Sequence, residues 1–268
     1  VHAYISPHLN KFNERIIIAN KEIKTKKLLE TLQFIKELNN NQPITFFEIT
    51  TAAALLLFSQ SKADFLILET GLGGRLDATN IIKKSLIDII TTIGKDHQEF
   101  LGTSLKKITN EKLGIIKPGS SVVISKQKKI IQEHIESKLK NKKNHLLIYN
   151  KDFKVIKINK NIFTIKYQNK TININKPRLR GDHQIINASN AVCAILRLNE
   201  LGYSFSKKII NIGIKKTVWP GRLELRKMNN HNVYLDGAHN IDGALQIKKY
   251  FNDKKLKIWI VLGMLKNK

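Results

Sequence analysis

The sequence predicts an α/β fold in which a mostly parallel sheet is flanked by helices, with a small antiparallel β portion and the start of a second α/β domain. Strand-like and helix-like segments alternate along most of the chain, which is typical of parallel strands joined by helices. Residues 145–176 differ, because they consist of short β-branched runs split by Asn and Lys, as in small antiparallel strands. Pro220 and Gly221 then give the strongest boundary signal.

Apolar spacing predicts the elements of the first half. Residues 25–39 carry leucine and isoleucine at helical spacing, whereas residues 46–59 are apolar enough for a more buried helix. The predicted elements, in order, are helices over 25–39 and 46–59, strands over 64–69 and 86–93, a helix from about Ser104, and a strand and helix within 121–140.

The second half continues the alternation after the β-rich insertion at about 145–176. Its predicted elements are helices over about 185–201 and 206–215, a strand over 231–235, a helix over 241–251 and a strand over 257–262. We therefore expect two domains, 1–218 and 219–268. The second is too short for a complete domain of this type.

Composition indicates a globular protein of the cytoplasm. With 268 residues, 42% of them apolar, the chain is able to form a substantial core. Its longest apolar run, from Ala52 to Phe58, is far shorter than the ~20 residues of a membrane-spanning helix. No signal peptide is visible, and the single cysteine, Cys193, fits a reducing compartment. We expect no membrane partner.

The net charge is strongly positive. Lysine and arginine number 47 against 21 acidic residues, which gives +26 and is compatible with nucleic-acid binding. However, the lysines are scattered and accompany isoleucine and asparagine, as in 157–162, a bias that AT-rich coding produces regardless of function. Aromatic residues, which stack on bases, are only 7%. We expect no nucleic-acid partner, and a basic nucleic-acid-binding protein is the less favoured alternative.

Residues 69–80 are the most informative stretch. A strand ends in Glu69, a turn containing Gly71, Gly73 and Gly74 follows, and Asp77 comes next. Strand ends in open α/β sheets are where ligands bind, and glycines let the backbone approach them closely. A carboxylate there is able to reach a metal ion or a polar ligand. A dinucleotide-binding turn is excluded, because the expected third glycine and helix start are missing.

Six stretches together resemble the folylpolyglutamate synthase/dihydrofolate synthase family, the folate branch of the ATP-dependent Mur-type ligases. They occur in the family's order and span nearly the whole chain. The stretches are Ser6-Pro7-His8-Leu9 with Phe12-Asn13-Glu14-Arg15-Ile16; the 69–80 segment; Gly94-Lys95-Asp96-His97 with Leu101-Gly102; Glu111-Lys112-Leu113-Gly114-Ile115; Gly181-Asp182-His183-Gln184 with Asn187-Ala188; and Trp219-Pro220-Gly221-Arg222 with Asp236-Gly237-Ala238-His239-Asn240.

The resemblance implies a ligase that uses ATP and Mg²⁺. In this family ATP phosphorylates the carboxylate of a pteroate or folylglutamate, and the amine of L-glutamate then attacks the acyl phosphate to give an amide. Residues 1–218 would form the ATP- and folate-binding central domain, and residues 219–268 the beginning of the glutamate-ligase domain. The family's glycine-rich phosphate loop is missing, so the sequence is expected to be a fragment cut at both ends.

By this resemblance, Ser6, Glu69 and His97 are the expected Mg²⁺ ligands. Glu69 ends one predicted strand and His97 lies in the loop after the next, and this placement at successive strand ends would bring both groups into one crevice. The alternatives are a carboxylate that caps the glycine turn and a loop histidine bonded to backbone.

Lys112 matches the family lysine that takes up CO₂ as a carbamate. Carbamylation would convert a cationic amine into an anionic oxygen group that helps to organise metal and phosphate. The alternative is an ordinary surface lysine paired with Glu111.

Asp77 and Thr79 match the loop that faces the pterin. A carboxylate is able to accept hydrogen bonds from the amino and ring N–H groups of a pterin. Because Asp and Asn favour turns, an Asx-type turn is the competing explanation.

The nucleotide would be held from two places in the chain. Gln184 and Asn187, at a helix start, would bond adenine or ribose. Arg222 would reach the phosphates, and Asp236 would bond the ribose hydroxyls. His239 would lie close to the phosphates and act with Lys112 as a catalytic residue.

Each of these assignments has a structural alternative. Asn187 could cap the helix, Arg222 could be a surface arginine, and Asp236 could be an acid of a turn.

Two other identities stay open within the same fold. The chain could be a different Mur-type ligase acting on a UDP-linked sugar peptide, or a catalytically inactive remnant of a folate ligase. The Ser6–Leu9 segment and the 74–80 loop favour the folate branch. The expected partners are dihydropteroate or folate, L-glutamate and ATP, and the chain is expected to act as a monomer.

Overall fold

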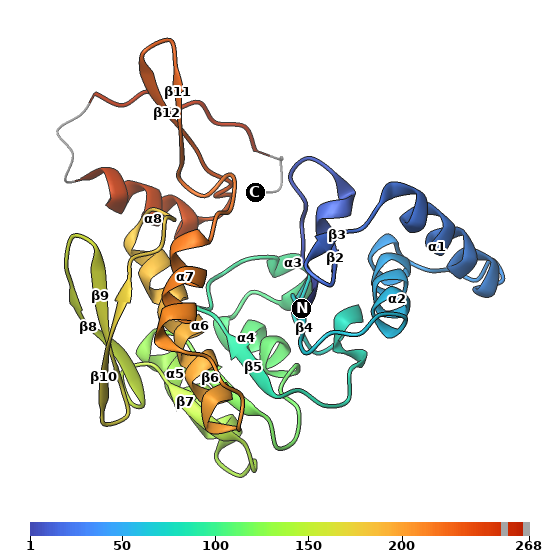
Figure 1. Cartoon of the computed structure of the whole chain (residues 1–268), viewed down its shortest axis with the longest axis horizontal. Helices are drawn as coiled ribbons and strands as arrows, with labels where there is room; N and C mark the ends of the chain where they lie inside the picture. Colours follow the sequence, from blue (N-terminus) through green and yellow to red (C-terminus); the bar gives the residue numbers. More distant parts are fainter. Residues whose placement is uncertain (253–256, 265–268) are drawn as a thin grey trace. The chain divides into compact units, whose positions relative to one another are not determined.

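The computed structural model describes residues 1–252 and 257–264 (Figure 1). The chain forms two compact units, Val1–Lys83 and Lys84–Lys268. The fold class is the predicted one, since helices alternate with strands and parallel pairing occurs in both units.

The first unit is a four-stranded sheet covered by two helices. The strand order is β3-β2-β1-β4, and β1 pairs with β4 in parallel through Tyr4 and Leu68. Paired parallel strands end at the same edge of the sheet, so the residues after Tyr4 and after Leu68 become neighbours. The elements are β1 (His2–Tyr4), η1 (Phe12–Arg15), β2 (Ile16–Ile18), β3 (Lys21–Glu22), α1 (Thr25–Leu38), α2 (Phe46–Ser59), β4 (Leu66–Leu68) and η2 (Ala78–Ile81).

Helix α2 begins at a capping box. Thr45 Oγ1 accepts the backbone N–H of Glu48 at 3.2 Å, and the Glu48 carboxylate accepts the N–H of Thr45 at 2.8 Å. Two of the helix's otherwise unpaired donors are thereby satisfied. Its buried face includes Leu57 and packs on the sheet, where the Tyr4 hydroxyl lies 3.0 Å from Thr50 Oγ1. The core of this unit therefore fixes the end of β1.

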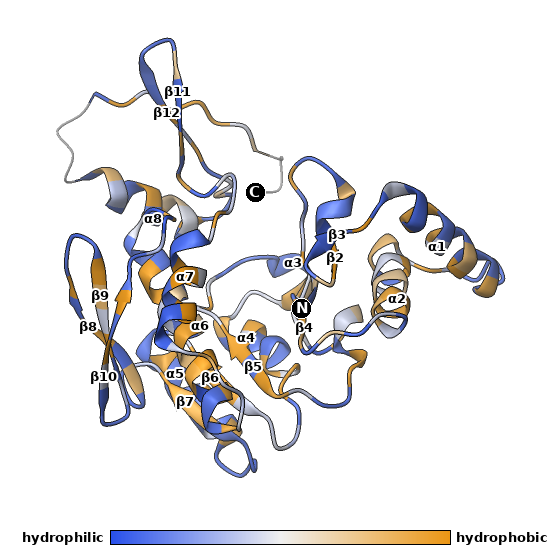
Figure 2. Ribbon diagram, viewed as in Figure 1, coloured by the Kyte–Doolittle hydropathy of each residue, from blue (hydrophilic) through white to orange (hydrophobic). Residues whose placement is uncertain are grey.

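The second unit is built on the parallel sheet β5-β6-β7. The register aligns Ile90, Ile124 and Ile148 across it, and β6 is buried along its whole length. Figure 2 shows β5 and β6 coloured as hydrophobic. The elements are β5 (Ile87–Ile90), α3 (Gln98–Leu101), α4 (Leu105–Leu113), β6 (Ser121–Ile124), α5 (Lys129–Leu139), β7 (His145–Ile148), β8 (Phe153–Ile158), β9 (Ile162–Tyr167), β10 (Lys170–Asn175), α6 (Asp182–Glu200), α7 (Lys207–Lys216), β11 (Glu224–Met228), β12 (His231–Leu235) and α8 (Ile241–Asn252).

Helices cover both faces of the parallel sheet. One core cluster joins Val122 to α4 through Ile108 and to α5 through Ile131, and another joins Val123 to α6 through Cys193. Successive β6 side chains point to opposite faces, which is why neighbouring residues enter different clusters. The antiparallel sheet β10-β9-β8 extends the second cluster. Both clusters together fix the ends of β5 and the start of α6, where several predicted site residues lie.

Most predicted elements are confirmed to within a few residues, but the assignments of 145–148 and 257–262 are wrong, and several short elements, β11 among them, were not predicted. Residues 145–148 are β7 of the parallel sheet, not part of the antiparallel insertion, which starts at Phe153. The sequence signal was misleading because β7 is short and its first residue is exposed. The hairpin strand β11 was not predicted, since the run Glu224–Met228 is mostly polar and charged.

The predicted strand over 257–262 does not form. The residues from 257 to 264 have no regular secondary structure, and Trp259, Ile260 and Val261 are 82%, 81% and 99% exposed. A strand needs a neighbour to satisfy its backbone groups, and none of the described strands pairs with this run. The apolar pattern of residues 257–262 therefore wrongly predicted a strand.

The predicted boundary at 218/219 stays a prediction. Strands β11 and β12 and helix α8 belong to the compact unit that begins at Lys84. Within residues 1–252 and 257–264, no helix combines the length and apolar character needed to traverse a bilayer.

Adjacent isoleucines on α5 allow a matched test of the core. Ile131 is 1% exposed and belongs to the cluster with β6, whereas Ile130 is 58% exposed. We expect Ile131→Ala to lower the free energy of unfolding by about 2–5 kcal/mol, because it leaves a cavity. Ile130→Ala should change it by no more than about 0.5 kcal/mol. Urea titration followed by circular dichroism measures both, and equal losses would contradict the described packing.

Candidate functional site

In the first unit, Ser6 and Glu69 meet at the ends of two parallel strands. The N–H of Glu69 donates to the carbonyl of Tyr4 at 2.9 Å, which continues the pairing of β1 with β4 by one residue. The Glu69 Oε2 atom then accepts the backbone N–H of Ser6 at 2.7 Å. The carboxylate predicted at this strand end is therefore present, and it lies directly beside Ser6.

The loop after Glu69 is organised by Asp77. Its Oδ2 accepts the N–H of Leu72 at 2.8 Å, and its Oδ1 accepts the N–H and hydroxyl of Thr79 at 3.0 and 2.6 Å. Thr79 is 5% exposed. The Asx-type turn considered above is thus present, and Asp77 shapes the glycine loop. Contact of these two residues with a substrate stays a prediction.

The Ser6–Ile16 motif forms a second ordered loop in this unit. Glu14 accepts three backbone N–H groups, those of residues 9–11, at 2.7–2.9 Å. These bonds, first that of Leu9, hold the pKa of the Glu14 carboxyl below its usual range. Arg15 Nε donates to His8 Nδ1 at 2.9 Å. The acid of this motif therefore has a structural role that sequence reasoning did not assign.

In the second unit, His97 is the N-cap residue of α3 and has a left-handed backbone, φ 49°. The conformation is supported by Asp96, whose Oδ1 accepts the N–H of His97 at 2.9 Å. The His97 Nε2 atom lies 3.9 Å from Asp96 Oδ2. His97 is therefore presented at a loop after β5, as predicted, with a carboxylate beside it.

Lys112 lies in the last turn of α4 and is half-buried. Its neighbours Ile108 and Leu113 face the core, so the lysine's backbone position is well anchored. Lys106, on the same helix, is exposed. Lys112 thus differs from the scattered surface lysines in its burial, while its modification stays a prediction.

Gln184 and Asn187 lie together in the first turns of α6. Gln184 is buried, and its Oε1 accepts a hydrogen bond from Asn187 Nδ2 at 3.2 Å. The Gln184 Nε2 atom lies 3.1 Å from His183 Nε2. Gly181, with φ 98°, precedes the helix and packs against the His183 ring. Asn187 is exposed, so of the two predicted residues it is the one that faces solvent.

Two loops near this helix are joined by Asp236. Its Oδ2 accepts the N–H of Leu223 and its Oδ1 that of Ala238, both at 2.8 Å. The N–H of Gly237 donates to the carbonyl of Gly221 at 2.8 Å. The Pro-Gly-Arg turn and the Asp-Gly-Ala-His-Asn loop are therefore hydrogen-bonded to each other, and the roles of Arg222 and Asp236 toward a nucleotide stay predictions.

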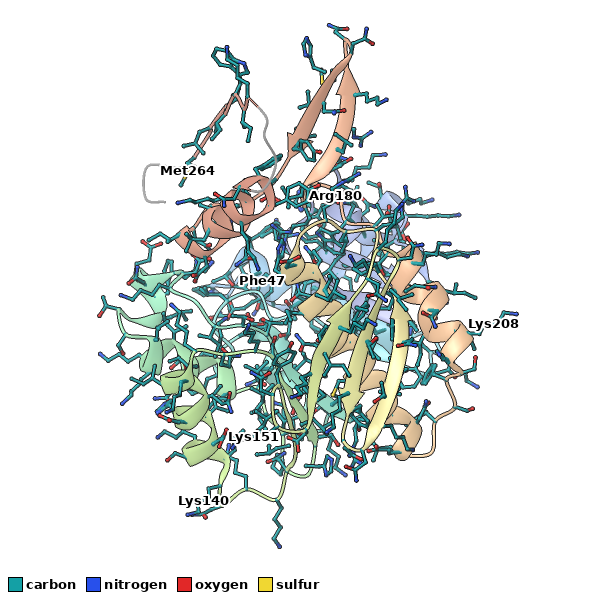
Figure 3. The ribbon with its side chains drawn as sticks, turned by 90° about the vertical axis from the view of Figure 1, so that its left-hand side faces the viewer. Phe47, Lys140, Lys151, Arg180, Lys208 and Met264 are labelled. Carbon is teal, nitrogen blue, oxygen red and sulfur yellow. The ribbon has the colours of Figure 1, made fainter. Side chains whose placement is uncertain are left out.

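His183 connects this structure to α6. Burial lowers the pKa of His183; the Asp236 carboxylate opposes this change, whereas the Arg222 guanidinium adds to it. Its Nδ1 atom is buried and has no hydrogen-bond partner among the described residues. Arg180, labelled in Figure 3 near the base of the β11–β12 hairpin, donates to the Leu223 carbonyl at 3.4 Å.

His239 is linked to the loop that carries His97. Its Nδ1 lies 3.0 Å from the carbonyl oxygen of Gly237, and its Nε2 lies 3.3 Å from Asp96 Oδ2. Asn240 Nδ2 donates to the same carboxylate oxygen at 3.0 Å. Asp96 therefore brings His97 and His239 to one place, although they are 142 residues apart in the chain.

Asp96 and His183 are the two residues that sequence reasoning missed. Both stand inside stretches that carried the resemblance, next to predicted residues, and the repeated Asp-His-Gln at 96–98 and 182–184 was a usable signal. No group of three or more His, Cys, Asp or Glu side chains within the described part of the chain has an arrangement suited to a metal ion.

A groove of about 540 Å³ lies away from these loops. It is lined by the β9–β10 hairpin and α7, including Asn173, Lys207 and Lys215. None of the predicted site residues lines it. Its size alone does not identify a functional site, because the side chains with the expected chemistry lie in the polar loops.

Comparison with known proteins identifies the fold family. Residues 15–195 match the Mur ligase middle domain. Over 286 aligned residues the chain is 32% identical to dihydrofolate synthase/folylpolyglutamate synthase of Bacillus subtilis, covering 100% of this chain and 65% of that protein. It is 32% identical to a probable dihydrofolate synthetase of Schizosaccharomyces pombe, covering 94% and 61%.

Solved structures give the same result. An FPGS–AMPPCP–folate complex superposes with a TM-score of 0.85 at 28% identity, covering 94% of this chain and 64% of that one. E. coli FolC in complex with DHPP and ADP gives 0.82 at 26% identity, covering 96% and 59%. The chain thus spans somewhat less than two thirds of the length of these relatives. It contains a Mur ligase middle domain and belongs to the Mur ligase family.

Proposed function

We propose that this chain is an ATP-dependent ligase that adds L-glutamate to dihydropteroate, to folylpolyglutamate or to both, through an acyl phosphate. The proposal rests mainly on the contact between the 94–97 loop and the 236–240 loop. There His97, a predicted metal ligand, and His239, predicted to lie close to the phosphates, both approach the Asp96 carboxylate. The names of the relatives and the AMPPCP, ADP and folate in their complexes support it.

The reaction brings together anionic partners, so cationic side chains have to lower their repulsion. Arg222 and His239 would face the phosphates, since both border the Gly237 backbone. Gln184 and Asn187 would bond the adenine or ribose, with Asn187 the exposed member of the pair. Asp236 would accept from the ribose hydroxyls. Each of its oxygens accepts one described N–H, and a carboxylate oxygen has capacity for another bond.

Mg²⁺ would be held by Ser6, Glu69 and His97. The donor set fits the ion in part, because carboxylate and hydroxyl oxygens are preferred Mg²⁺ ligands, and the backbone bond from Ser6 already places these two residues together. When bound, the ion would neutralise charge on the phosphates. Carbamylated Lys112 would add an anionic group on the α4 side.

The pterin would contact the 69–80 loop. Asp77 fixes the conformation of this loop, and its carboxylate would also accept N–H bonds from the pterin, with Thr79 holding one carboxylate oxygen. We further propose a cytoplasmic monomer without nucleic-acid or membrane partners, which the single cysteine and the scattered lysines support. An inactive remnant and a ligase for UDP-linked sugar peptides are the competing functions.

A substrate comparison tests the function. The chain is incubated with ATP, Mg²⁺ and L-glutamate plus dihydropteroate, a folylmonoglutamate or a UDP-linked sugar peptide, and ADP and amide product are both quantified. We expect ADP and amide in equal amounts with a pteridine substrate. Product with the sugar peptide alone would identify a different Mur-type ligase. Failure to form ADP and amide with any of the three would support the remnant.

Replacing Glu69 tests the metal assignment. Glu69→Gln keeps the shape but removes the charge, so we expect the Mg²⁺ concentration for half-maximal activity to rise about 10- to 100-fold. Glu22→Gln removes the same charge from an exposed position of β3 and should leave it unchanged. A magnesium titration at saturating ATP measures both. Identical curves for the two variants would remove Glu69 from the metal site.

Replacing Lys112 tests the carbamate. Lys112→Arg keeps the positive charge but cannot take up CO₂, so we expect kcat to fall about 100-fold. Lys106→Arg, on the exposed face of the same helix, should retain wild-type kcat. The wild type should also lose activity in CO₂-depleted buffer and recover it with bicarbonate, whereas the Lys112→Arg variant should not respond. Full activity of Lys112→Arg would contradict the assignment.

A further inference from the structure

We infer that Asp96 is a positioning residue that fixes the orientation of the His239 ring toward the anionic part of the substrates. The inference rests on the proposed function, because it concerns the side chain that would face the phosphates. Asp96 itself would not touch the reacting atoms. It would act through the His239 ring.

Both ring nitrogens of His239 lie close to an oxygen atom. Its Nδ1 lies 3.0 Å from the Gly237 carbonyl oxygen, and its Nε2 lies 3.3 Å from Asp96 Oδ2. The first contact stays within the 236–240 loop, and the second reaches the 94–97 loop. Two contacts on opposite sides of the ring fix its orientation, so removal of the Asp96 carboxylate would leave the ring held from one side.

Asn240 fixes the carboxylate in place. Its Oδ1 accepts the N–H of Gly243 at 2.8 Å, at the start of α8, so the amide orientation is determined. The Nδ2 group then points to Asp96 Oδ2, at 3.0 Å. The same oxygen that faces the His239 ring is thus held by a donor from the neighbouring residue. The His97 backbone N–H holds the other carboxylate oxygen.

The 94–97 and 236–243 segments pack closely at Gly94. A Cβ atom on Gly94 would collide with the Asp242 carboxylate in the first turn of α8. Within the second segment, a Cβ on Gly243 would approach the Ala238 Cβ to 2.8 Å, so glycine there allows the tight turn into α8. The Asp96–His239 contact is therefore part of a tightly fitted junction between the 94–97 and 236–243 segments.

Several charged side chains surround the His239 ring. Asp96 and Asp242 come from the two facing segments, Arg222 lies against Gly237, and His97 Nε2 is 3.9 Å from Asp96 Oδ2. One carboxylate oxygen thus lies near two imidazoles. A phosphate group near this loop would meet a ring whose direction is already set, which lowers the cost of reorganisation.

The test is a double-mutant cycle in the full chain. Asp96→Asn is isosteric but uncharged, and His239→Gln removes the ring. We expect Asp96→Asn to lower kcat/KM for ATP about 10- to 100-fold in the wild-type background and to have little further effect beside His239→Gln. Asp96→Glu should recover part of the loss. Additive effects of the two substitutions, or wild-type kinetics for Asp96→Asn, would overturn the inference.

A matched control separates positioning from folding. Glu99→Gln removes one negative charge from an exposed site three residues away and should keep wild-type kinetics. Asp96→Asn and Glu99→Gln should both keep the wild-type Tm. If Asp96→Asn instead lowers Tm, and KM and kcat for every substrate change together, its role is merely structural and the inference is overturned.

A spectroscopic readout works even if the wild type forms no amide and the proposed function fails. In ¹⁵N-histidine-labelled protein, comparison with His239→Gln assigns the ring signals of His239. We expect these signals to keep their wild-type positions in Glu99→Gln and to shift in Asp96→Asn, because the carboxylate beside Nε2 is lost. An unchanged ring spectrum in Asp96→Asn would overturn the inference independently of activity.

Discussion

Backbone pairing between parallel strands is the constraint on which the candidate site depends. Pairing of β1 with β4 makes Ser6 and Glu69 neighbours although they are 63 residues apart. In the second unit, the β5-β6-β7 register places the loop after β5, with Asp96 and His97, at an edge of the sheet. Because parallel strands end at the same edge of their sheet, the polar residues that follow them lie close together outside the core.

The loops that gather at these edges are held by carboxylates that accept backbone N–H groups. Asp77, Asp96 and Asp236 each accept one or more N–H groups of their own loop, and Asp236 joins two loops. Such bonds replace water around the carboxylate with fixed dipoles and order the loop. Residue type alone therefore does not tell whether such an acid shapes its loop or would also contact a ligand.

Local patterns predicted most of the fold. The apolar spacing of α1 and the capping box of α2 lie within short windows, so a sequence pattern contains all the required information. Strand β7 and the run 257–262 are different, because the pairing of a strand depends on partners distant in sequence. The same reason applies to the site. Asp96 and His183 stand in recognisable stretches, but their significance comes from residues distant in sequence. Asp96 approaches His239, 143 residues away, and the Asp236 carboxylate acts electrostatically on His183, 53 residues away.

The buried position of Cys193 allows opening of the core to be measured by thiol labelling. The thiol is fully enclosed by α6 and the antiparallel sheet, and burial raises its pKa, so it is neither accessible nor ionised in the folded chain. Since it is the sole sulfhydryl in the sequence, an alkylating reagent would modify the protein only when the second unit opens. The rate of labelling therefore reports opening of that core, with no probe introduced.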